Sequence, residues 1–234
     1  MKKAFSMMEI VFVLVIMGVL AAVILPTTKT DPLHEAATQL ASHIRYTQHL
    51  AMSDDRYDKN RKDDDGNIIW YKERWQLVFS ESKYTDDKYA YTIFSDTAGN
   101  STGDASESEI AINPQNADQI MTGGYGDPQA IDIRDDGFRG MATLNIGKKY
   151  GITDVKLKGG CSQNRISFDH LGRPFTGKQS SMDTPYNSGG TQRLVTKDEG
   201  CKIILSHTSG DITVRITKET GFVCILKEGT DICQ

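Results

Sequence analysis

The chain has 234 residues, of which 38% are hydrophobic and 25% are charged, with 21 glycines and 6 prolines. This balance is typical of a folded domain and excludes disorder along the whole chain. The formal net charge is −4, so the surface as a whole is a poor match for nucleic acid, and no nucleic-acid partner is expected.

A long apolar stretch comes first. Residues 5–25 read FSMMEIVFVLVIMGVLAAVIL and carry a single charge, Glu9. As a helix this stretch is about 31 Å long, close to the thickness of a bilayer core. Lys2 and Lys3 precede it, and a basic flank of this kind stays in the cytoplasm. The pattern therefore predicts a single-pass protein of the bacterial inner membrane, with its C-terminal domain in the periplasm.

Glu9 is unexpected inside an apolar run, because a buried carboxylate needs a partner. A cleaved signal peptide is one alternative, with Ala21-Ala22 as its cleavage site, but it has no reason to carry this charge. Gly18 and Ala22 are four residues apart and form a small-residue face for close helix packing. Pro26 ends the run. Four residues are therefore predicted to serve helix assembly: Glu9, Gly18, Ala22 and Pro26.

The string from Lys2 to Glu9, KKAFSMME, resembles the processing site of type IV pilins and pseudopilins. The resemblance implies that a prepilin peptidase cuts between Ala4 and Phe5 and N-methylates Phe5. Ala4 stands where the family usually has glycine. A charged amine on Phe5 can then pair with Glu9 of a neighbouring subunit at low dielectric. The implied partners are other pilins or pseudopilins, the prepilin peptidase and an inner-membrane assembly platform.

A second helix is predicted over residues 32–55. Asp31-Pro32 reads as an N-cap followed by a proline in the first turn. Apolar residues then recur with helical spacing, at Leu33, Ala37, Leu40, Ile44 and Ala51. The histidines of this segment are spaced nine and six residues apart, which does not place all three on one face. Neither a metal nor a cofactor is expected.

The remaining chain predicts antiparallel strands at 68–71, 74–80, 88–95, 152–158, 164–169, 201–207, 211–217 and 221–227. Residues 96–130 are rich in Gly, Ser, Asn and Asp and predict an irregular insertion. Asp63, Asp65 and Asn67 resemble the start of a calcium loop, but Ile68 and Arg74 stand where such a loop needs Gly and Glu.

The predicted fold class is α+β, a long N-terminal helix packed on an antiparallel β-sheet domain of pilin type. The helix spans the membrane with its first half and is amphipathic in its second. The predicted domains are a leader over 1–4, a transmembrane helix over 5–26, an amphipathic continuation over 27–56 and a periplasmic β domain over 57–234.

Four cysteines lie in the last third of the chain, an even number that is compatible with two disulfides in an oxidising compartment. A hairpin with Glu228-Gly229 at its tip would place Cys224 opposite Cys233, at a pair where side chains are close. Cys161–Cys201 then follows by elimination. The other two connectivities remain open.

A second resemblance lies in three segments: 40–51, ISFDHLGRP at 166–174 and ITKETG at 216–221. These are similar to H-type minor pseudopilins and T-type minor pilins. The resemblance implies a minor pseudopilin that joins a pseudopilus for protein export by a type II secretion system. The alternative is a minor type IV pilin in pilus assembly, adhesion or DNA uptake. A modest basic cluster keeps DNA capture open: Lys148, Lys149, Lys156, Lys158 and Arg165.

The chain is predicted not to be an enzyme. It has no GxSxG, no HExxH and no catalytic pairing of Cys with His. Asp169 and His170 are adjacent in a predicted strand and turn, where a structural or exposed role is expected.

Overall fold

The computed structural model describes residues 6–24, 31–63, 65–97, 103–126, 130–187, 189–190 and 192–234. These residues form two compact units, Met1–Asp31 and Pro32–Gln234. The first unit contains one helix, α1 (Met7–Ile24). The second contains all the other elements, and each unit is described by itself.

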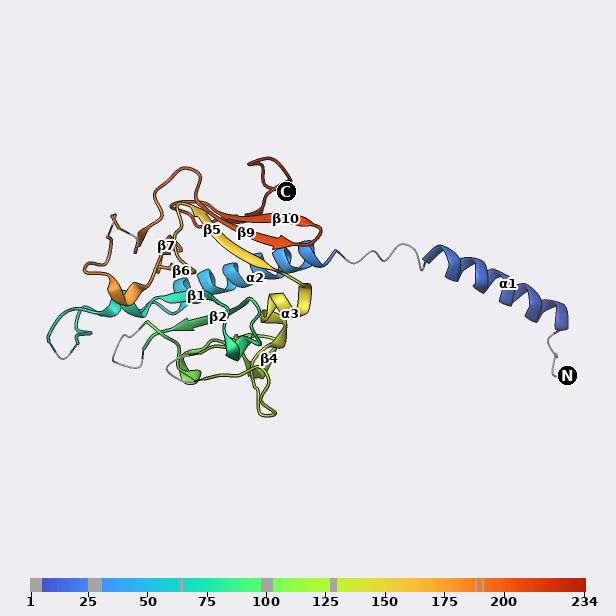
Figure 1. Ribbon diagram of the computed structural model, residues 1–234, viewed down its shortest axis with the longest axis horizontal. Coiled ribbons are helices and arrows are strands. Elements are labelled where there is room, and N and C mark those ends of the chain that lie inside the picture. The colour runs from blue at the N-terminus through green and yellow to red at the C-terminus, as the bar shows by residue number, and fades with distance from the viewer. Residues whose placement is uncertain are drawn as a thin grey trace. The chain divides into compact units, whose positions relative to one another are not determined.

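The second unit is built mainly of short strands around one long helix (Figure 1). Its helices are α2 (Pro32–Ser53) and α3 (Ile146–Tyr150). Its strands are β1 (Trp75–Ser80), β2 (Ala90–Ser95), β3 (Ile112–Asn113), β4 (Asn116–Ile120), β5 (Asp154–Gly159), β6 (Arg165–Phe168), β7 (Pro174–Thr176), β8 (Arg193–Leu194), β9 (Cys201–His207), β10 (Gly210–Ile216) and β11 (Val223–Ile225).

Across the parts of the chain that the structure describes, no helix combines the length and the apolar character needed to cross a membrane. Helix α1 has 18 residues, which is about 27 Å, whereas a bilayer core is about 30 Å thick. Two predictions are therefore wrong. These are the membrane-spanning first half of the N-terminal helix, and the single-pass inner-membrane location with a periplasmic C-terminal domain.

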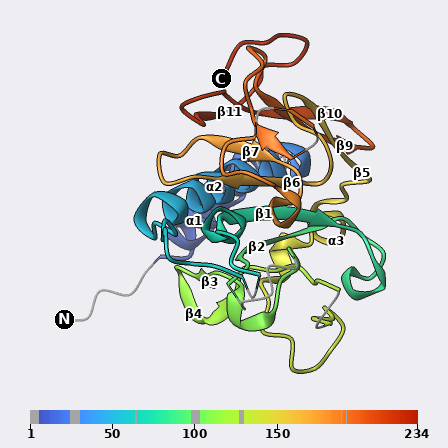
Figure 2. The same cartoon turned by 90° about the vertical axis from the view of Figure 1, so that its left-hand side faces the viewer.

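Helix α2 follows its apolar stripe as predicted. All five residues of the predicted stripe are buried, together with Ala36, Ala41 and Thr47. The helix ends at Ser53 rather than 55. It contacts strands of both larger sheets, and Figures 1 and 2 show β9 and β10 on one side of it and β2 on the other. The core of the unit therefore forms around α2.

The strands form three antiparallel sheets rather than one. The five-stranded sheet has the order β2-β1-β6-β7-β8, the four-stranded sheet has the order β11-β10-β9-β5, and β3 pairs with β4. The strand predicted at 68–71 is wrong, since Trp70–Glu73 form a 3-10 helix. Trp70 and Tyr71 are both buried there, in a small cluster with Phe175 and Met182. Because both rings are buried, this segment lacks the alternation of a half-buried strand.

The insertion predicted at 96–130 covers the outer edge of β2 with its described residues. Ala111 donates a backbone hydrogen bond to Ile93 (2.9 Å), and Ile93 donates one to Met121 (3.0 Å). Gly123 donates another to Tyr91 (3.2 Å). An open edge strand can pair with other chains, so the insertion closes this side of the sheet.

A partly buried polar network joins α2 to β2 and α3. The Tyr150 hydroxyl donates to Gln39 Oε1 (2.8 Å), and Gln39 Nε2 donates to the Tyr91 hydroxyl (2.9 Å). The Tyr91 oxygen lies 2.7 Å from His43 Nδ1. Since the Tyr91 oxygen already accepts from Gln39, its own proton can go to His43, which must then be neutral. Burial lowers the pKa of His43 to about 4.

Acid is expected to destabilise the fold through His43. Its folded pKa lies below its unfolded value, so its contribution is complete above about pH 6.5 and is lost as the pH falls toward 4. The loss is about 3 kcal/mol in the free energy of unfolding. We expect His43→Gln to show a smaller loss than the wild type in urea titrations between pH 7 and 4.

Two comparisons make this test specific. Burial raises the pKa of Asp96 to about 6, and this opposite shift lowers stability as the pH rises, so only differences between variants are informative. His49 is exposed on the same helix, and His49→Gln should follow the wild type. Parallel curves for His43→Gln and the wild type would contradict the assignment.

Candidate functional site: the first helix and a pocket beside the second

Helix α1 presents apolar side chains on every side. Each large hydrophobic residue from Met7 to Leu20 is exposed, from 51% at Val11 to 85% at Met7. Within residues 6–24 the only charged side chain is Glu9. Exposed apolar surfaces of this extent are sites of association in soluble proteins. Within its own unit, α1 is therefore a helix whose apolar surface is unburied.

Ser6 and Glu9 together cap the N-terminus of α1. The Ser6 backbone N–H donates to Glu9 Oε2 (2.9 Å), and the Met8 N–H donates to Ser6 Oγ (3.2 Å). This is a capping-box arrangement, which satisfies two of the N–H groups that a helix leaves without partners. Sequence reasoning missed Ser6, although Ser-x-x-Glu before an apolar run is a recognised signature of a helix start.

The predicted assembly residues do not form one cluster. Glu9 and Gly18 are nine residues apart, about 14 Å along the helix. Gly18 is open, because apart from its chain neighbours and the nearby backbone of its own helix no atom lies within 4 Å of the position of an added Cβ. Ala22 also lies in α1. The processing residues Ala4 and Phe5, and Pro26, lie outside the described residues.

Both predicted disulfides are present. Cys161 is bonded to Cys201, and Cys224 to Cys233. The predicted hairpin register is wrong, because Cys233 faces Leu226 rather than Cys224. The tip is as expected, since Thr230 donates to the Lys227 carbonyl. Two disulfides are compatible with folding in an oxidising compartment.

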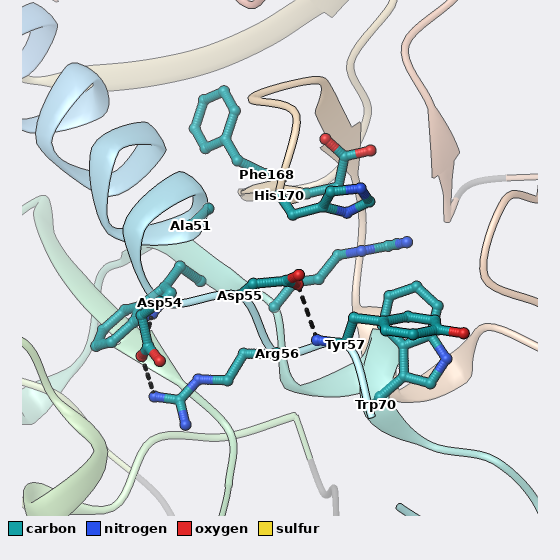
Figure 3. Close-up of a pocket in the computed structure, with 11 residues that line it drawn as sticks. Ala51, Asp54, Asp55, Arg56, Tyr57, Trp70, Phe168 and His170 are labelled. Atoms are coloured by element: carbon teal, nitrogen blue, oxygen red, sulfur yellow. Dashed lines mark hydrogen bonds and ion pairs between the residues drawn. The ribbon is translucent and has the colours of Figure 1, made fainter. Parts of the chain in front are cut away.

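A small polar pocket lies at the C-terminal end of α2 (Figure 3). Asp54 pairs with Arg56 at 2.5 Å and accepts a hydrogen bond from Trp75 Nε1 at 3.0 Å. Arg74 also lines the pocket, and burial lowers its pKa to about 10. The pocket holds about 10 Å³, room for about one water molecule, so it is too small for an organic substrate.

The pocket also contains Asp169 and His170, the pair considered for hydrolytic chemistry. Asp169 is 2% exposed and binds Arg173 through Nε (2.8 Å) and Nη2 (2.7 Å). It also accepts the backbone N–H groups of Leu171 and Arg173. Its carboxylate therefore holds the turn after β6. His170 Nδ1 is buried without a hydrogen-bond partner, so the two side chains are not arranged as an acid–base pair.

The basic cluster and the calcium-like stretch considered from the sequence do not form binding sites, because their side chains lie apart or already have partners. Arg165 is buried, Lys148 pairs with Asp86 and Lys156 pairs with Asp154, so the basic cluster is not one surface patch. Asp63, from the calcium-like stretch, accepts the Asn67 N–H (2.7 Å). Within the described ranges, no cluster of three or more His, Cys, Asp or Glu side chains could hold a metal ion.

Comparison with known proteins identifies no relative of this chain. Neither a protein-family model, nor a curated protein, nor a solved structure matches this chain. The functional argument therefore depends on the residues and the geometry described above.

Proposed function

We propose that the chain is a minor pseudopilin, a subunit that joins a pseudopilus and serves protein export by a type II secretion system. The observation that carries the proposal is α1, a helix that is exposed and apolar on every side and has one carboxylate in its first turn. Like helices packed side by side would bury these surfaces, at about 25 cal/mol per Å² of apolar area. The role is mechanical, and no catalytic activity is proposed.

The position of Glu9 supports the same role. The only hydrogen bond described for its carboxylate is the one it accepts from the Ser6 backbone N–H, and its negative charge is not compensated by any cation of the described part of α1. If the chain is cut between Ala4 and Phe5, as the KKAFSMME string suggests, the new amine of a neighbouring subunit can supply that cation. A carboxylate left alone among packed apolar helices is costly, so pairing favours one register.

Glu9→Gln is expected to reduce incorporation into filaments by about tenfold or more, which corresponds to about 1.4 kcal/mol for one lost charge pair. Glutamine at this position still caps the helix, so a defect would come from the lost charge. The measurement is the fraction of subunit in sheared filaments from cells with the complete assembly machinery. It should be accompanied by the intact mass of the assembled subunit, which is expected to begin at N-methylated Phe5.

Two variants serve as controls. Glu35→Gln removes an exposed glutamate from the first turn of α2 and should leave incorporation unchanged. Ser6→Ala removes a cap contact but keeps the charge, and should have a smaller effect than Glu9→Gln. Normal incorporation of Glu9→Gln, or an assembled subunit with an uncut N-terminus, would refute the proposal.

A further inference from the structure

Asp96 follows directly after β2, and its carboxylate is buried. The residue is 1% exposed. One carboxylate oxygen, Oδ2, accepts the backbone N–H of Gly103, which lies in the insertion. The other oxygen, Oδ1, is buried without a hydrogen-bond partner. A buried anion with an unpartnered oxygen is costly, whereas the neutral acid loses much less on burial. The position of Asp96 therefore favours its protonated form.

Two buried glutamates lie close to Asp96. Glu109 Oε1 accepts the backbone N–H of Thr97, the residue that follows Asp96 (2.6 Å). On the other side, the hydroxyl of Ser95 donates to the backbone carbonyl of Glu73 (2.6 Å). Like charges at short range in a buried site oppose the ionisation of a carboxyl group. The two glutamates therefore act in the same direction as the burial of Asp96.

A third carboxylate, Asp104, follows Gly103 in the insertion. Within the described residues, the cations of this region pair with the other carboxylates and not with Asp96. The pairs are Arg61 with Glu73 (2.6 Å), Lys178 with Asp104 (2.9 Å) and Arg165 with Asp104 (3.6 Å). Burial, together with the charges of the three neighbouring carboxylates, raises the pKa of Asp96 to about 6.

The part of the insertion that begins at Gly103 covers the edge of β2, and we call residues 103–111 the covering segment. At its far end, Ala111 donates to the Ile93 carbonyl (2.9 Å). At its near end, Gly103 donates to Asp96. Two of the three neighbouring carboxylates belong to the covering segment itself. The segment is thus held at one end by the same carboxyl group that its own charges repel.

We propose that Asp96 is a pH-dependent switch that controls how often the covering segment leaves the edge of β2. With a protonated carboxyl group, Asp96 holds the segment closed. When the group ionises, opening is favoured, because it admits water to Oδ1 and separates Asp96 from Asp104 and Glu109. An uncovered edge strand has free N–H and C=O groups that can pair with another strand. This device goes beyond the packing of α1 and does not depend on it.

The direction of the effect follows from proton binding. The closed segment holds the Asp96 proton more tightly than the open one, where the pKa returns to its ordinary value of 3.8. Closure is therefore strongest in acid and weakens as the pH rises through about 6. Between about pH 5 and about pH 7.5, these two pKa values predict that the opening equilibrium constant rises about tenfold.

The test is amide hydrogen exchange of the full-length chain in mild detergent at these two pH values, with each rate divided by its intrinsic rate. Protection of the covering segment is expected to fall about tenfold at the higher pH, and to fall less in β9 and β10, which belong to the other sheet. Asp96→Asn keeps an acceptor for Gly103 but cannot ionise, so its covering segment should be equally protected at both pH values. Unchanged wild-type protection, or a wild-type response in Asp96→Asn, would overturn the proposal.

Two further measurements separate the switch from a general effect of charge. Asp118→Asn removes an exposed carboxylate from β4 in the same insertion and should respond to pH as the wild type does. The titration of the Asp96 carboxyl carbon, followed by NMR in the wild type, needs no variant to fold and should have its midpoint near pH 6. A midpoint near the ordinary value of 3.8, or loss of the response in Asp118→Asn, would also overturn the proposal.

Discussion

Removing the Cys161–Cys201 disulfide is expected to lower the free energy of unfolding by about 4 kcal/mol. This bond closes a loop with a sequence separation of 40, and a closed loop of that length restricts the unfolded chain strongly. The loop contains β6, β7 and β8, three strands of the five-stranded sheet, while β5 and β9 at its ends belong to the four-stranded sheet. The bond therefore closes the segment that leaves one sheet, crosses to the other and returns.

The measurement is urea unfolding of Cys161→Ala/Cys201→Ala, followed by the fluorescence of Trp70 and Trp75, which both lie in the second unit. Cys224→Ala/Cys233→Ala is the matched control, because it also removes one disulfide and two thiols but its separation is 9. The shorter loop predicts a loss of about 2.5 kcal/mol. Equal losses for the two pairs, or a larger loss for the control, would contradict the argument from loop length.

Local sequence patterns were sufficient to predict the amphipathic helix and the main strands. The apolar stripe of α2 has helical spacing, and every residue of it is buried. Trp75, Leu77 and Phe79 alternate with their neighbours and indicated the strand at β1, but the expected half-burial is wrong, because Gln76 and Val78 are buried as well. The pairing of Cys224 with Cys233 is present although the hairpin register from which it was inferred is wrong, and Cys161–Cys201 followed only by elimination.

The features that were missed depend on contacts between distant segments. The insertion reads as a loop because its residues are small and polar, yet its backbone pairs with β2 across almost 30 positions, as between Ile93 and Met121. The predicted register of Cys224 and Cys233 failed because Cys233 lies opposite Leu226 instead. His43 lies off the apolar stripe of α2, but its partner Tyr91 is 48 residues away. Local periodicity does not encode such pairings.

The same difference between local signals and properties of the folded chain applies to the candidate site. The apolar character of α1 and the isolated charge of Glu9 are visible in the sequence, but the bond from the Ser6 N–H to Glu9 is a property of the folded helix. The first helix was predicted over 5–26, and within the described residues it runs from Met7 to Ile24. The position of Asp96 among other carboxylates could not be predicted at all, since it depends on which distant segments meet at the end of β2.

Phe94→Ala is expected to destabilise the second unit by about 3–5 kcal/mol, the usual cost of removing a buried aromatic ring from a core. Phe94 is fully buried in β2. Its ring lies 6.1 Å from that of Tyr125 and 5.6 Å from the Arg165 guanidinium, measured between ring centroids and from the guanidinium carbon respectively. Since Tyr125 belongs to the insertion, Phe94 joins the insertion to the sheet whose edge it covers.

The control is Phe222→Ala, because Phe222 is 57% exposed and the same atoms are removed. That variant should lie within about 0.5 kcal/mol of the wild type in urea unfolding. In Phe94→Ala, amide hydrogen exchange should accelerate most at residues 103–126 and in β2, because the cavity forms between them. A loss for Phe94→Ala as small as that for Phe222→Ala would contradict the position of this ring in the core. Uniformly faster exchange would instead show that the insertion does not depend on it.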